Sequence, residues 1–74
     1  MLHKAKKLED AAAEHRRAIE MAEALAADFP AVLDYRQEVP TCHNNLGVVL
    51  ADLGKLSEAE AEYRTALRYN ERLV

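Results

Sequence analysis

Residues 43 to 70, which read HNNLGVVLADLGKLSEAEAEYRTALRYN, decide the fold. Large apolar residues recur in the first part of this stretch at helical steps of three and four, at Leu46, Val49, Leu50 and Leu53. The spacing predicts an amphipathic helix that stops at Gly54, because glycine adopts the left-handed conformation of a helix C-terminus without strain.

A further helix is predicted over residues 57 to 73, where Ser57 and Glu60 have the spacing of an N-terminal capping box. Glu60 also stands four residues before Arg64, which favours an ion pair on the helix surface. Only the linker 54 to 56 separates this helix from the preceding one, so we expect the two to be antiparallel neighbours.

A helix is also predicted in the first part of the chain. Its apolar stripe runs from Leu8 to Phe29. Pro30 disfavours helical geometry in the residue before it, so we expect this helix to end near Ala27 or Asp28.

The region between Pro30 and Gly54 contains Pro40, which lacks an amide donor. A proline is tolerated in the first turn of a helix but disrupts a helix interior. The sequence therefore predicts a short helix near residues 31 to 38, a kink or a break at Val39-Pro40, and a helix from about Pro40 or Thr41 to Leu53.

An internal repeat relates the first and last helices, because residues 7 to 26 align with residues 55 to 74 at an offset of 48. Nine of the twenty aligned pairs are identical. The aligned packing positions are Ala11 with Ala59, His15 with Tyr63, and Ala18 with Ala66. One helix used twice, with a different helix between, indicates a helical solenoid whose neighbours bury a continuous core.

Residues 43 to 70 resemble a tetratricopeptide repeat, a helical hairpin that stacks into arrays. The first helix of this family places a large, a small and a large residue on its packing face, and Leu46, Gly47 and Leu50 match them. Small, aromatic and small residues follow on the second helix, and the match here is Ala59, Tyr63 and Ala66, with Ala11, His15 and Ala18 in the first copy.

The resemblance implies an all-α, single-domain fragment of an alpha-solenoid over residues 1–74, about one and a half repeats long. Residues 1–29 are expected to be the second helix of a partial repeat, with 1 to 6 as the last turn of a missing first helix. Residues 31–74 are expected to be one complete repeat. The offset of 48 exceeds the family period of 34 by about four helical turns, so both helices can lengthen without rotating their faces. Segments such as FPAVLDYRQEV and the ending NERLV resemble the long-helix, kinesin-light-chain-like variety and many bacterial arrays.

The resemblance also implies a non-catalytic module that binds a protein or peptide partner. The partner is expected on the concave, exposed face of the first helix of the complete repeat, which is the helix that precedes Gly54. The corresponding positions are Thr41, Asn44, Val48, Ala51 and Asp52. An alternative reading is a self-associating hairpin, in which the stripe from Leu8 to Phe29 forms a coiled-coil seam and a homodimer buries Leu8, Ile19 and Leu25.

Composition excludes several other classes. Ten Lys and Arg against thirteen Asp and Glu give a net charge of −3, which argues against non-specific binding to nucleic acid or to anionic membranes. A chain of 74 residues is too small for a deep catalytic pocket, and no apolar run approaches the roughly 18 residues of a membrane span.

The residues capable of chemistry are few. Cys42, the single cysteine, cannot form an internal disulfide, which favours a reducing, cytoplasmic location. Cys42 and His43 are adjacent on a helix and should point about 100° apart, without a second base or a set of metal ligands. His15 aligns with Tyr63, so we expect it to pack in the core, and we expect no metal and no cofactor.

Overall fold

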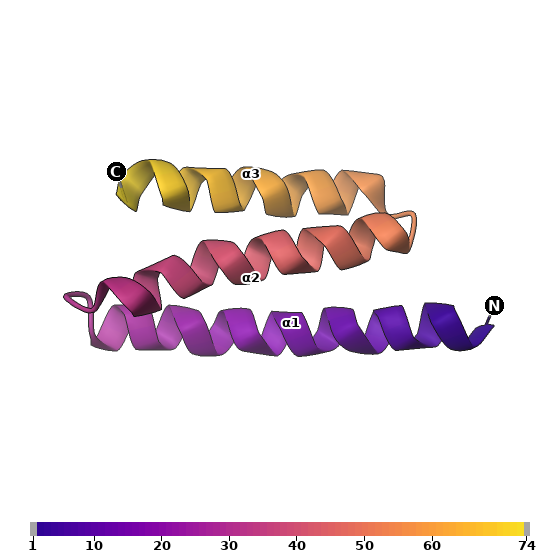
Figure 1. Cartoon of the computed structure of the whole chain (residues 1–74), viewed down its shortest axis with the longest axis horizontal. Coiled ribbons are helices and arrows are strands. Elements are labelled where there is room, and N and C mark those ends of the chain that lie inside the picture. Colours follow the sequence, from indigo (N-terminus) through magenta and orange to yellow (C-terminus); the bar gives the residue numbers. More distant parts are fainter. Residues whose placement is uncertain (1, 74) are drawn as a thin grey trace.

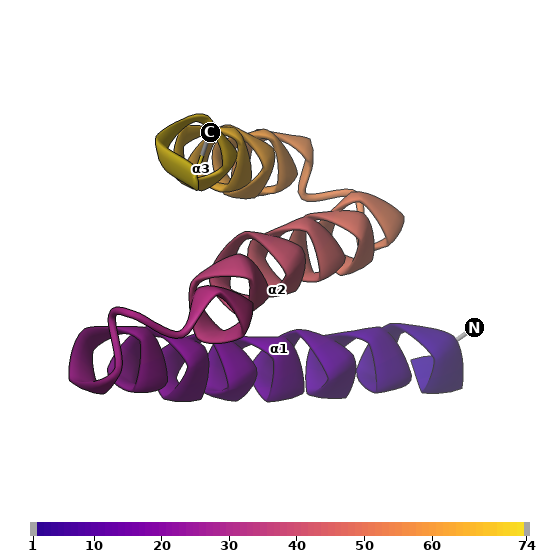
Figure 2. The same cartoon turned by 60° about the vertical axis from the view of Figure 1, so that its left-hand side comes forward.

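The computed structural model describes the backbone of residues 2–73 and the side chains of residues 6–71. Within that range the chain forms three helices, α1 (Leu2–Asp28), α2 (Leu33–Asp52) and α3 (Leu56–Leu73). Figure 1 shows α2 lying between α1 and α3 and running antiparallel to both, and the side view in Figure 2 keeps the same order. The predicted all-α fold with an antiparallel helical hairpin is confirmed.

The predicted end of α1 is confirmed, because its last helical residue is Asp28. The amide of Phe29 still donates to the carbonyl of Leu25 at 2.8 Å, and the amide of Val32 donates to the carbonyl of Phe29 at 3.0 Å, which closes the turn. The start differs from the prediction. Residues 2 to 6 continue α1 without interruption, so they are not the last turn of a separate helix.

The predicted break at Val39-Pro40 is wrong, because α2 runs from Leu33 to Asp52 with Pro40 inside it. Figure 1 shows the α2 ribbon continuing through this region. A proline in a helix interior costs about 3 kcal/mol, so tertiary packing must offset that cost. Val39 is only 1% exposed, and Pro40 is itself buried. The hydroxyl of Thr41 donates to the carbonyl of Gln37, one turn back along the same helix, at 3.0 Å.

Gly54 ends α2 as predicted, in the left-handed region at φ 82°. The amide of Gly54 donates to the carbonyl of Ala51 at 3.0 Å, and the amide of Lys55 donates to the carbonyl of Leu50 at 2.8 Å. These two bonds are the pair found in a Schellman motif, which satisfies the last carbonyls of a helix.

The predicted capping box at the start of α3 is wrong. The helix begins one residue earlier, at Leu56, and the amide of Ala59 donates to the carbonyl of Lys55 at 2.9 Å. Ser57 is therefore inside the first turn and does not cap it. The carboxylate of Glu60 instead accepts a hydrogen bond from Arg64, which confirms the predicted ion pair at this spacing.

The core is a thin seam along α2 that small residues dominate. One cluster of buried residues joins all three helices and consists of Ala12, Ile19, Cys42, Leu46, Leu50 and Ala59. The alanines let the helix axes approach each other closely. The molecule is flat and elongated, with extents of 44 × 20 × 12 Å, so its surfaces for contact with other molecules are helix faces and the grooves between helices.

Candidate functional site

The face of α2 that points away from the core carries the residues for which sequence resemblance implies partner binding. Thr41, Asn44, Val48 and Asp52 are exposed, while Ala51 is half-buried against the core. Val48 is the large apolar side chain of this face and is 52% exposed. The Thr41 hydroxyl is engaged with the Gln37 carbonyl, whereas the amide of Asn44 forms no side-chain hydrogen bond with the residues that the structure describes. Asn44 and Val48 therefore offer a polar group and an apolar patch one helical turn apart.

On the opposite side of α2, a close approach to α3 holds the helix in position. A Cβ atom added to Gly47 would lie 2.6 Å from Cε1 of Tyr63, so the tyrosine ring occupies the space that any other residue at 47 would need. Leu46 and Leu50 are 2% and 1% exposed, and Ala59 and Ala66 are equally well buried on the facing helix. Tyr63 covers Gly47 while remaining 40% exposed at its outer edge.

A polar contact that the sequence analysis did not predict joins α2 to α3 on the other flank. Nδ1 of His43 lies 2.6 Å from Oε1 of Glu62, and both side chains are largely buried. The His43 ring stacks on the ring of Tyr69, with centroids 5.9 Å apart. The Tyr69 hydroxyl donates to Oε2 of Glu23 on α1 at 3.4 Å, so this flank connects all three helices.

The structure places the candidate packing residues of α1 at the edge of the core. Ala11, His15 and Ala18 are only half-buried. Among the side chains of α1 that the structure describes, those buried against the rest of the protein are Ala12, Ile19 and Ala22, at 2%, 7% and 6% exposure. Because Ile19 belongs to this core, the expectation that a second copy would bury it is wrong.

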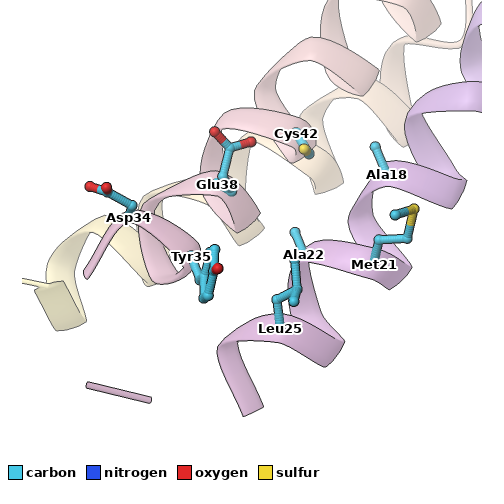
Figure 3. A pocket seen from close by; sticks show the side chains of 8 residues that line it. All are labelled: Ala18, Met21, Ala22, Leu25, Asp34, Tyr35, Glu38 and Cys42. Carbon is cyan, nitrogen blue, oxygen red and sulfur yellow. The ribbon is translucent and has the colours of Figure 1, made fainter. Parts of the chain in front are cut away.

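A pocket lies between α1 and the first half of α2, beside the exposed face of α2. Its volume is about 410 Å³. Figure 3 shows small and apolar side chains on the α1 side, and two carboxyl groups among the residues on the α2 side. The lining residues are Ala18, Met21, Ala22, Leu25, Asp34, Tyr35, Glu38 and Cys42. Sequence patterning did not predict this pocket, because it depends on how α1 packs against a helix that continues through Pro40.

Cys42 and His43 lie on different sides of α2, because Cys42 lines the α1 pocket while His43 contacts Glu62 on α3. Burial raises the pKa of the Cys42 thiol above its ordinary value, and the nearby charge of Glu38 raises it further. A thiol with a raised pKa is a weak nucleophile at neutral pH. Among the residues that the structure describes, no group of three His, Cys, Asp or Glu side chains is arranged to hold a metal ion.

None of the described helices combines the length and the apolar character needed to cross a bilayer.

Comparison with known proteins identifies one family. Residues 40–73 match the family model of the tetratricopeptide repeat. The match begins at Pro40 within α2 and extends through α3, so it contains the Gly47 and Tyr63 contact and the exposed face of α2. No curated protein and no solved structure matches the chain.

Proposed function

We propose, from the premise that residues 40–73 are a tetratricopeptide repeat, that the chain is a protein-interaction module that binds a peptide or a helix on the exposed face of α2. The observation that carries this proposal is the exposure of Val48 beside Asn44 on a helix whose opposite side is fixed in the core. An amide side chain can pair with a peptide backbone, and an adjacent apolar side chain can hold one side chain of the partner.

The proposal assigns no catalytic role to the chain. His43 is engaged with Glu62, and Cys42 lies on the opposite flank, so the two do not form a nucleophile and base pair. We place the protein in the cytoplasm, because a single cysteine with a free, buried thiol is typical of a reducing compartment.

A selection for short peptides tests this function directly. Peptides selected for binding to the chain from a random display library should bind with micromolar or weaker affinity, because one repeat offers one short surface. Val48→Lys should weaken the selected peptides by roughly tenfold or more, because it removes the central apolar contact. Asn44→Ala should weaken them less.

Leu67→Lys is the matched control, because Leu67 is another exposed apolar residue, 58% exposed, but lies on α3. Circular dichroism checks that each variant keeps its helicity. Binding that survives Val48→Lys but is lost in Leu67→Lys would move the interaction surface from α2 to α3 and refute the proposed face.

Self-association is a second candidate, favoured by the exposure of Met21 and Leu25 on α1, at 67% and 37%. If a second copy covers these residues, dilution should lower the melting temperature, because dissociation removes the stabilisation that mass action provides. Sedimentation and thermal melts over a hundredfold range of concentration measure this. A melting temperature independent of concentration, together with a monomeric mass, would eliminate the homodimer.

A further inference from the structure

The two copies of the repeated helix, α1 and α3, differ in how deeply one set of aligned alanines is buried. In α3 that side includes Ala59 and Ala66, which are 2% and 1% exposed because the hairpin places α2 over them. In α1 the aligned Ala11 and Ala18 are only half-buried. The same sequence element is thus covered by a helix in one copy and left partly open in the other.

The open side of α1 continues into the pocket between α1 and α2, since Ala18 belongs to both. Met21, Ala22 and Leu25 form the rest of the α1 wall. Met21 is 67% exposed and unbranched, so its side chain can adapt to the shape of an apolar neighbour. This wall can therefore contact a partner helix whose apolar side chains form a stripe along one face.

Two of the four residues that line the pocket on the α2 side are acidic. Asp34 and Glu38 stand one helical turn apart, and neither forms an ion pair with any residue in the described part of the chain. None of the described residues that line the pocket is basic. An acidic rim beside an apolar floor selects a partner that carries positive charge next to its apolar residues.

We propose that this pocket and the adjoining side of α1 dock an amphipathic helix of a partner protein, with its apolar stripe against Ala18, Met21 and Leu25 and with Lys or Arg side chains beside Asp34 and Glu38. The proposal rests on the proposed function, because it names the chemistry of a protein partner. It adds a surface that is separate from Asn44 and Val48 on the exposed face of α2.

Three designed peptides of sixteen residues test this chemistry. The first is an alanine-rich helix with a leucine stripe flanked by lysines; the second replaces its lysines with glutamates; the third replaces its leucines with serines. Titrations of the ¹⁵N-labelled full chain followed by NMR should show that the first peptide shifts the amide signals of Ala18, Leu25 and Glu38. The glutamate and serine peptides should bind at least about threefold more weakly, because the first lacks the positive charges and the second lacks the apolar stripe.

Variants locate the binding. Ala18→Lys should weaken the lysine peptide by about tenfold, because it places a bulky cation in the docking surface. Ala13→Lys is the matched control on the same helix, since Ala13 is exposed and lies outside the pocket. The double variant Asp34→Asn, Glu38→Gln keeps the shapes of both side chains and should weaken binding by about threefold to tenfold, with a smaller dependence on salt.

Cys42 supplies an independent readout, because it is the single thiol of the chain and lines the pocket. A docked lysine peptide should slow its alkylation by iodoacetamide. Equal binding of the lysine and glutamate peptides, or equal binding by the Ala18→Lys and Ala13→Lys variants, would overturn the proposal. Dimerisation of the chain alone that Ala18→Lys abolishes would also overturn it, by making a second copy the occupant.

Failure here is distinguishable from failure of the proposed function, because Val48→Lys should leave binding of the lysine peptide unchanged. If Val48→Lys alone abolishes that binding, the peptide occupies the exposed face of α2 and the α1 pocket is not a docking site.

Discussion

The first and last helices share a repeated sequence but bury different sides of it. In α3 the buried alanines are Ala59 and Ala66, and in α1 their counterparts, Ala11 and Ala18, are half-buried. Over residues 6–28 of α1, the buried residues are instead Ala12, Ile19 and Ala22. At the aligned positions α3 carries Glu60, Leu67 and Asn70, all of which are exposed.

This difference shows that the repeated helix has two packing sides. One side faces the helix that precedes it in the same hairpin, as α3 faces α2. The other side faces the helix that follows it, as α1 faces α2. Glu60 and Asn70 in α3 replace the small apolar residues of α1, so the second side of α3 is suited to solvent where that of α1 is suited to a helix.

Exchanging aligned residues should have the largest effect on stability. Ala12→Glu should destabilise the protein by about 3 kcal/mol or more, because it puts a carboxylate without a partner into the core. The reciprocal change Glu60→Ala should stay within about 0.5 kcal/mol, because the pair with Arg64 is exposed. Urea denaturation followed by circular dichroism measures both. Comparable losses of stability in the two variants would show that α1 and α3 bury the same side.

Enlarging the small residues of the α2 and α3 contact should have the next largest effect. Ala59→Leu and Gly47→Leu should each cost about 1 to 3 kcal/mol, because the first site is closely packed and the second is filled by the Tyr63 ring. Ala51→Leu should cost less than either, since Ala51 is half-buried at the edge of the contact. Similar midpoints of chemical denaturation for all three variants would mean that the register of α2 against α3 is incorrect.

Much of the fold could be predicted from sequence because local rules act on particular residues. The three-four spacing around Leu46, the stop at Gly54 and the proline after Phe29 each act over a few residues, so they fixed the ends of helices. The break at Pro40 was predicted by the same local reasoning and was wrong. The rule that proline breaks a helix considers only the backbone of that helix. It leaves out the stabilisation that comes from burying Val39 against the rest of the protein.

The candidate site could likewise be predicted only in part. Exposure of Thr41, Asn44, Val48 and Asp52 followed from helical periodicity once the packing side of α2 was identified. The contact between His43 and Glu62 required the register of two helices. Folding the chain back at Gly54 places position 43 opposite position 65, about one turn beyond Glu62, so the signal was present but imprecise.

The bond between His43 and Glu62 is a further difference between the two copies, because Glu14, the residue of α1 that aligns with Glu62, is exposed. A double-mutant cycle with His43→Ala and Glu62→Gln should give a coupling of about 1 kcal/mol, the usual value for a largely buried side-chain hydrogen bond. Glu14→Gln should have almost no effect. Additive effects of the two single substitutions would show that the bond contributes nothing to the hairpin.

The smallest expected effect concerns Cys42 on the α1 side. Because burial and then Glu38 raise the pKa of this thiol, little thiolate forms at neutral pH and alkylation should be slower than for a free cysteine. The raised pKa stabilises the fold at pH values below the ordinary thiol pKa, and that stabilisation is lost as the pH rises through the raised value. Glu38→Gln should lower the pKa and accelerate alkylation at most a few-fold. An unchanged or slower rate in this variant would contradict the influence of Glu38.

Methyl NMR on the unmodified chain can show directly whether the repeated helix packs on different sides in its two copies. Nuclear Overhauser effects should connect the methyl groups of both Ala12 and Ala59 to the leucine methyl groups of α2, because all belong to one buried cluster. The methyl group of Ala11 should give weaker effects to α2 than that of Ala12. Strong effects from Ala11 to Leu46 or Leu50, with none from Ala12, would show that α1 packs like α3 and would contradict the account.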